Sequence, residues 1–218
     1  MITIPRVKIC CISSVEEARM AVECGAAALG LVGHMPSGPG VISDELISTI
    51  VKTVPPPVAT FLLTSETDPA AIISHYKKVH ASVIQIVDAL AERQYDTLRR
   101  ELPAVKLVQV IHVTDERSVT EAIEVSKHVD AILLDSGNPN LAVKELGGTG
   151  RTHNWDLSRT IRESIDIPLY LAGGLNKENV RQAIDKVQPF GIDLCSGVRT
   201  SGKLDKEKLQ AFFAAINS

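Results

Sequence analysis

The feature that most constrains the fold of this chain is a regular alternation of short apolar segments with longer segments of helical periodicity. Eight such pairs fit into 218 residues, at about 27 residues for each pair. A strand followed by a helix, repeated along a chain, predicts a parallel β-sheet. Eight repeats match the closed (β/α)8 arrangement known as the TIM barrel, for which this length lies near the short end of the range. We therefore predict an α/β protein with a single-domain (β/α)8 barrel over residues 1–218.

The predicted elements follow one another without a linker or a change in composition. The expected strands are 6–11, 27–33, 57–63, 82–87, 105–113, 130–135, 167–172 and 190–195, and the expected helices are 14–24, 43–52, 68–78, 91–100, 115–127, 154–164, 176–187 and 205–216. Ser13 or Ser14 is expected to cap the first helix, and Gly25 to end it. A doubly wound open sheet is the alternative architecture, but no GxGxxG motif follows the first strand.

Composition and charge exclude several classes of function. A net charge of −3 offers no basic field for nucleic acid. No apolar run approaches the roughly 20 residues that span a bilayer, and residues 1–8 lack the features of a signal peptide. The four cysteines show no CxxC spacing and the six histidines no HxxxH or HxH cluster. We therefore predict a cytoplasmic protein with reduced thiols and without a metal site, a nucleic-acid partner or a membrane partner.

Strand alternation indicates which side chains of the first strand point into the barrel. Successive residues of a barrel strand face the interior and the helix layer in turn. A lysine facing the helices would be an unpaired buried charge, so we predict that Lys8 points inward, together with Cys10 at the end of the strand. Cys11 is then expected to pack under a helix. The alternative for Cys10 is that of most buried cysteines, a small apolar core residue.

Further polar side chains lie at the ends of later strands. Asp135 ends the sixth strand, Asp193 lies near the end of the eighth, and Gln85 lies between two isoleucines on the fourth. An Asp at a strand end is often a turn residue or a helix cap, and Asp193 could instead be a structural acid paired with Lys8. Functional residues of a (β/α)8 barrel lie at the carboxyl ends of its strands. These three side chains and Cys10 are therefore the candidate site.

Glycine-rich loops follow the last three predicted strands. Glycine lets the backbone approach a ligand closely, and the loops after strands seven and eight of a barrel often bind phosphate. The alternative is that turns between strands and helices simply need glycine. Because three such loops would lie at one end of the barrel, we predict a ligand that carries phosphate. The predicted phosphate-binding residues are Gly147, Gly148, Gly173, Gly174, Ser196 and Gly197.

At these residues the sequence resembles the phosphoribosylanthranilate isomerase family of tryptophan biosynthesis, which has a barrel of the ribulose-phosphate-binding type. The resemblance extends over nearly the whole chain, and the motifs occur in the family's order and spacing. They are similar to the family's KIC, LLD…GGTGKTxxW, AGGLNPENV and DVSSGVE motifs. The matching stretches are Val7-Lys8-Ile9-Cys10, Leu133-Leu134-Asp135, Gly147-Gly148-Thr149-Gly150-Arg151-Thr152 with Trp155, Leu171 to Val180, and Asp193 to Val198.

The resemblance implies a cofactor-free Amadori rearrangement of an aminoaldose phosphate to an aminoketose phosphate. Asp135 would be the general acid that protonates the ribose ring oxygen and opens the ring to a Schiff base. Cys10 would be the general base that removes the C2′ proton, and Lys8 would favour its thiolate form. The residues expected to bind the substrate are Lys8, Gln85, Asp193 and Arg199, and the glycine loops would hold the phosphate.

The chain departs from the family pattern at several positions. Cys11 stands where the family usually has glycine, and Arg199 where it has glutamate. The loop 36–43 lacks the family's arginine for the anthranilate carboxylate, and Val87 stands in place of a histidine. Losing that arginine removes a bidentate contact, which we expect Arg199 or His34 to replace from another loop.

These departures leave two alternatives to phosphoribosylanthranilate isomerase activity. One is a related phosphosugar isomerase with a different aglycone, and the other is a non-catalytic barrel that binds a phosphorylated ligand. In every case the expected partner is a phosphorylated small molecule, and the expected assembly is a monomer or a homodimer. The Pro36–Gly40 loop, rich in glycine and proline, is a candidate lid.

Overall fold

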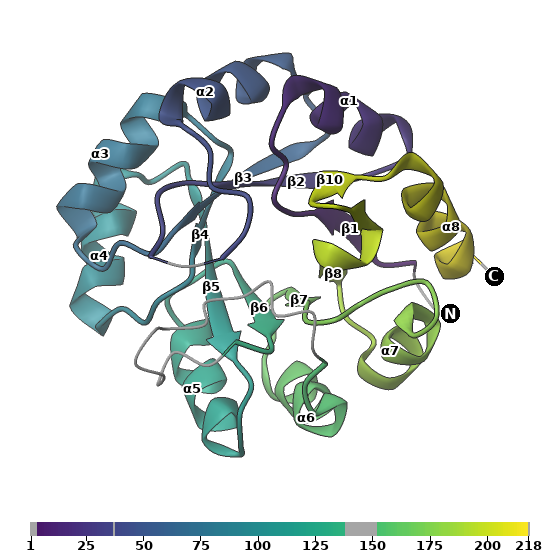
Figure 1. Ribbon diagram of the computed structural model, residues 1–218. Helices are drawn as coiled ribbons and strands as arrows, with labels where there is room; N and C mark the ends of the chain where they lie inside the picture. The colour runs from purple at the N-terminus through teal and green to yellow at the C-terminus, as the bar shows by residue number, and fades with distance from the viewer. Residues whose placement is uncertain (1–3, 37, 138–151, 218) are drawn as a thin grey trace.

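Eight parallel strands close into a barrel in the order β1 to β8, with β8 paired to β1, and helices surround them (Figure 1). This computed structural model describes residues 4–36, 38–137 and 152–217. The strands are Arg6–Ile9 (β1), Ala28–Val32 (β2), Ala59–Thr64 (β3), Val83–Ile86 (β4), Lys106–His112 (β5), Ala131–Asp135 (β6), Leu169–Leu171 (β7) and Gly191–Leu194 (β8). The predicted barrel is confirmed, and the open-sheet alternative is wrong.

Helices alternate with the strands as the periodicity predicts. They are Val15–Glu23 (α1), Asp44–Thr53 (α2), Pro69–Val79 (α3), Glu92–Glu101 (α4), Arg117–Ser126 (α5), Trp155–Ser164 (α6), Val180–Val187 (α7) and Lys206–Asn217 (α8). Ser14 caps α1, since its side chain accepts a hydrogen bond from the backbone N–H of Glu17. Gly25 follows that helix with φ +106°, a conformation that favours glycine. None of the helices in the described ranges is long and apolar enough to cross a bilayer.

The structure corrects the predicted helix starts near the last strands. The helix expected from Asn176 begins only at Val180, because the Asn176 side chain accepts hydrogen bonds from the N–H groups of Glu178 and Asn179 and holds a turn there.

Three short elements that were not predicted follow β8. They are a 3-10 helix, Ser196–Val198 (η1), and an antiparallel pair of strands, Arg199–Thr200 (β9) and Lys203–Leu204 (β10).

Alternate residues of each strand build two separate apolar layers. One layer joins the strands to the helices, and the other fills the barrel interior. The register aligns inward-facing residues of neighbouring strands, so that Leu63 lies opposite Gln85 and Val110 opposite Leu133. Large interior side chains include Phe61 and Tyr170, whose rings meet edge to face with centroids 5.9 Å apart.

A buried ion pair lies where the barrel closes between β1 and β8. Lys8 and Asp193 are register partners, and the Lys8 ammonium lies 2.9 Å from an Asp193 carboxylate oxygen. Lys8 is fully buried, and its ammonium also lies 5.3 Å from the ring centroid of Phe61. Burial, the largest single cause, would lower the pKa of Lys8, but the charge and hydrogen bond of Asp193 together with the neighbouring thiols outweigh it, so that the pKa lies above its ordinary value. Gly30 leaves room for the lysine, since a Cβ there would lie 3.0 Å from Nζ.

Replacing Lys8 is expected to destabilise the fold strongly. Lys8→Met leaves the buried Asp193 carboxylate without a counter-charge, which should lower the free energy of unfolding by about 3–5 kcal/mol. The measurement is urea unfolding at pH 7. Lys127→Met, which removes an exposed pair with Glu124 on the surface, is the matched control and should change the value by less than about 1 kcal/mol. Equal effects of the two variants would contradict the structural role of the buried pair.

Candidate active site

A pocket of about 730 Å³, part of it open solvent, lies at the carboxyl ends of the barrel strands. Every strand contributes to it at or near its end. The contributors, from the first strand to the eighth, include Cys10, Val32, Leu63, Gln85, Val110, Asp135, Ala172 and Asp193. The loop after β2 adds Met35, Gly38 and Pro39, so part of the predicted lid segment does line the pocket. This is the end of the barrel at which such folds place their chemistry.

Asp135 is the acidic group of the pocket with the most perturbed pKa. It ends β6, and its carboxylate accepts a 2.7 Å hydrogen bond from the N–H of Ser136. Burial raises the pKa of Asp135 to about 6, and the nearby charge of Asp193 acts in the same direction. The carboxyl group is therefore partly protonated near neutral pH, as a general acid requires.

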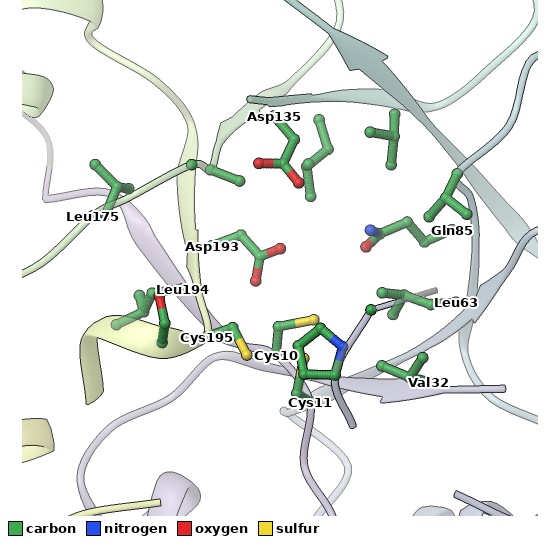
Figure 2. A pocket seen from close by; sticks show the side chains of 18 of the residues that line it. Cys10, Cys11, Val32, Leu63, Gln85, Asp135, Leu175, Asp193, Leu194 and Cys195 are labelled. Carbon is green, nitrogen blue, oxygen red and sulfur yellow. The ribbon is translucent and has the colours of Figure 1, made fainter. Parts of the chain in front are cut away.

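Three further predicted residues share this pocket with Asp135. Figure 2 shows Asp193, Gln85 and Cys10 directed from different strands toward the same space as Asp135. The buried Oδ1 of Asp193 and the buried Oε1 of Gln85 have no hydrogen-bond partner within the described structure. Buried polar atoms normally have partners, so these two oxygens are available to a ligand. Lys8 does not line the pocket, and it acts on the site through Asp193 beneath it.

The structure describes four of the six predicted phosphate-binding residues, and three of those four line the pocket. Gly173 and Gly174 follow β7 with φ of +83° and +62°, and both line the pocket beside Ser196. Gly197 does not line it. A Cβ at Gly197 would lie 2.2 Å from the carbonyl oxygen of Leu175, so this glycine lets the loops after β7 and β8 approach each other. The remaining two predicted residues, Gly147 and Gly148, lie outside the described residues.

Arg199 was expected to contact the substrate, but its side chain does not line the pocket. Its guanidinium pairs with Glu17 at 3.1 Å and donates to the carbonyl oxygens of Cys10 and Cys11 at 3.2 and 2.6 Å. It is absent from the pocket lining, and so is the exposed His34. The structure thus gives Arg199 a structural role instead of the predicted substrate contact, because a buried guanidinium needs acceptors and the protein itself supplies them.

The expectation that Cys11 packs under a helix is also wrong. Cys11 has φ +60°, so the strand alternation ends there and its side chain lines the pocket. Such a φ explains why glycine suits this position. Cys195 also lines the pocket and was not predicted as a site residue, although the alternation of side chains along a strand puts residues 193 and 195 on the same face.

The pocket carries little positive charge. No lysine, arginine or histidine is among its lining residues in the described part of the chain. One side is apolar and is formed by Val32, Met35, Leu63 and Val87. Within the same described ranges, no group of three or more His, Cys, Asp or Glu side chains is placed to hold a metal ion.

A closed parallel barrel with a carboxyl group of raised pKa, a thiol and glycine loops around one pocket defines an enzyme of acid–base chemistry on a small ligand. The sequence profile described as N-(5'phosphoribosyl)anthranilate (PRA) isomerase matches residues 7–215. The chain belongs to this family, as its motifs predict.

Individual relatives agree with this assignment. The N-(5'-phosphoribosyl)anthranilate isomerase of Methanosarcina acetivorans is 33% identical over 97% of this chain and 92% of its own length. The structure of the phosphoribosyl anthranilate isomerase of Thermotoga maritima has a TM-score of 0.82 at 32% identity and 98% coverage of both chains. A further phosphoribosyl anthranilate isomerase, solved in complex with reduced 1-(o-carboxyphenylamino)-1-deoxyribulose 5-phosphate, has a TM-score of 0.79 at 30% identity, also with 98% coverage of both chains.

The raised pKa of Asp135 predicts a pH-dependent gain of stability in Asp135→Asn. The folded pKa of about 6 exceeds the ordinary value of 3.8, so ionisation in the folded state costs stability as pH rises through this window. At pH 7.5 the free energy of unfolding of Asp135→Asn should exceed that of the unmodified chain by about 1–3 kcal/mol. Near pH 4 the two free energies should agree. The measurement is urea unfolding at both pH values.

Asp96→Asn provides the matched control for this comparison, because Asp96 is exposed on α4. It should change the free energy of unfolding by less than about 0.5 kcal/mol at both pH values. A gain in Asp135→Asn that is the same at pH 4 and pH 7.5 would contradict the ionisation argument.

Proposed function

We propose that this chain catalyses the Amadori rearrangement of N-(5-phosphoribosyl)anthranilate to the 1-deoxyribulose 5-phosphate product of tryptophan biosynthesis, without a cofactor. The observation that carries the proposal is the pocket that Asp135, with a pKa raised to about 6, shares with Cys10. Family membership supports the same activity. The whole site lies within one chain, so either a monomer or a homodimer could act, and a cytoplasmic location stays a prediction.

The reaction needs one proton donor and one proton acceptor on the same sugar. Protonated Asp135 gives its proton to the ribose ring oxygen, the C1′–O bond breaks, and the ring opens to a Schiff base. Cys10 in its thiolate form then removes the C2′ proton, and the electron pair moves toward the nitrogen to give an enolamine. The enol form tautomerises to the aminoketose. Asp193, held by Lys8, keeps one carboxylate oxygen free for the sugar.

The remaining pocket residues would orient the substrate. The backbone N–H groups of the loops at Gly173, Gly174 and Ser196 are proposed to bind the phosphate, together with Gly147 and Gly148. Gln85 is proposed to bind a sugar hydroxyl, because its side-chain oxygen is buried in the pocket wall and lacks a partner in the described structure.

Turnover of phosphoribosylanthranilate is the direct test, followed as the loss of substrate fluorescence. The unmodified chain should be active, and Asp135→Asn and Cys10→Ala should each lower kcat by about 10²–10⁴-fold, because each removes one proton-transfer group. Cys24→Ala is the matched control, since Cys24 lies at the end of α1 and does not line the pocket; it should keep full activity. No turnover at high enzyme concentration would reject the activity, and intact activity in both site variants would reject the mechanism.

A different aglycone is the second candidate function, and the uncharged pocket wall favours it. A site that pairs with the anthranilate carboxylate should reject the corresponding aniline adduct by about 10⁴-fold or more, whereas an apolar wall discriminates only by about 10²-fold or less. We expect the smaller ratio, because no cation lines the described part of the pocket. The measurement is kcat/KM for the two phosphoribosyl adducts, and the larger ratio would contradict this expectation.

A further inference from the structure

Three thiols meet at the pocket where β1 and β8 end. The N–H of Cys10 donates to the carbonyl oxygen of Leu194 at 2.9 Å, which extends the β1–β8 register and brings Cys195 beside Cys10. The left-handed backbone of Cys11 turns its side chain into the same pocket. Cys10, Cys11 and Cys195 all line this pocket, and Figure 2 shows the three side chains grouped on one side of it.

The two thiols without a role in the proposed reaction differ in chemical character. The neighbouring Cys11 side chain lowers the pKa of the Cys195 thiol, and the nearby Arg199 guanidinium acts in the same direction. The neighbouring Cys10 and Cys195 side chains, together with burial, raise the pKa of the Cys11 thiol. Cys195 is half-buried and Cys11 is buried. A partly exposed thiol of lowered pKa beside a buried thiol of raised pKa is the arrangement of a redox-sensitive cysteine and its resolving partner.

We propose that Cys195 is a site of reversible oxidation by hydroperoxides and that Cys11 resolves it as a disulfide that switches off the active site. Cys195 and Cys11 both line the pocket, and Figure 2 shows their side chains near each other beside Cys10. A covalent link between them would hold the ends of β1 and β8 together beside Cys10, the proposed base. The inference goes beyond the proposed isomerase activity, since the disulfide can be observed without any substrate.

The oxidation proceeds in two balanced steps. The Cys195 thiolate attacks one oxygen of hydrogen peroxide, the O–O bond breaks, and hydroxide leaves, so that Cys195 becomes a sulfenic acid. The sulfur of Cys11 then attacks the Cys195 sulfur, the S–S bond forms, and the S–O bond breaks. The displaced oxygen leaves as water with the proton of Cys11. Overall the two sulfur atoms lose two electrons, and one peroxide is reduced to one hydroxide ion and one water, the hydroxide becoming water when it takes a proton from solvent.

The test combines thiol counting, intact mass and disulfide mapping after a hydrogen peroxide titration of the full chain. The unmodified protein should lose two of its four free thiols and the mass of two hydrogens, and peptide mapping should find Cys11 joined to Cys195. Isomerase activity, where present, should fall in parallel, and a dithiol reductant should restore thiols and activity together. Cys11→Gly and Cys195→Ser should each prevent the two-thiol loss.

Two further variants separate this site from its neighbours. Cys24→Ser, outside the pocket, should lose two thiols as the unmodified chain does. Cys10→Ala should still form the disulfide between Cys11 and Cys195. The disulfide is detected by intact mass, so this measurement does not depend on catalytic activity. A disulfide mapped to Cys10 in the unmodified chain, a two-thiol loss that persists in Cys195→Ser, or no disulfide in the peroxide titration would overturn the proposal. An active but peroxide-insensitive enzyme would reject the switch alone, whereas an inactive protein that forms the link would reject the isomerase activity alone.

Discussion

The buried pair of Lys8 and Asp193 is the interaction on which both the barrel and its pocket depend. It joins the first strand to the last one, where the barrel closes, and the lysine is fully buried. One carboxylate oxygen of Asp193 is held by the lysine, and the other faces the pocket without a partner in the described structure. The remaining negative charge contributes to the raised pKa of Asp135. A single pair therefore joins the first and last strands, positions a carboxylate oxygen that faces the pocket and contributes to the raised pKa of the proposed acid.

Three departures from the family pattern converge at the end of β1. Cys11, Cys195 and Arg199 stand where the family motifs have glycine, serine and glutamate, and the structure brings all three into one network. Arg199 satisfies the carbonyl oxygens of Cys10 and Cys11 and pairs with Glu17 on α1. This bonding supports a left-handed residue that is not glycine, since strained backbone persists only where its surroundings hold it. Substitutions that are far apart in the sequence therefore lie together at the carboxyl ends of β1 and β8.

The pocket combines a preserved side and an altered side. The acid, the thiol and the described glycine loops after β7 and β8 occupy one part of it, as the family motifs predict. The opposite wall, which includes Val87 from the end of β4 and Met35 from the loop after β2, is apolar. The groups proposed to move protons are retained, whereas the groups that the family pattern places around an aromatic acid are changed. Recognition and chemistry are separable here because different loops of the barrel supply them.

The sequence by itself determined the eight strand–helix units, the closed barrel and the inward direction of Lys8, Cys10, Asp135 and Asp193. These follow from local rules, namely the period of two along a strand and the cost of burying an unpaired charge. Only the tertiary structure decided the roles of Cys11 and Arg199. Cys11 lies beyond the last residue of β1, where alternation no longer applies and its positive φ reverses the expected direction. Arg199 is bound to Glu17, 182 positions away in the sequence, and a partner this distant is found only once the first and last strands lie side by side.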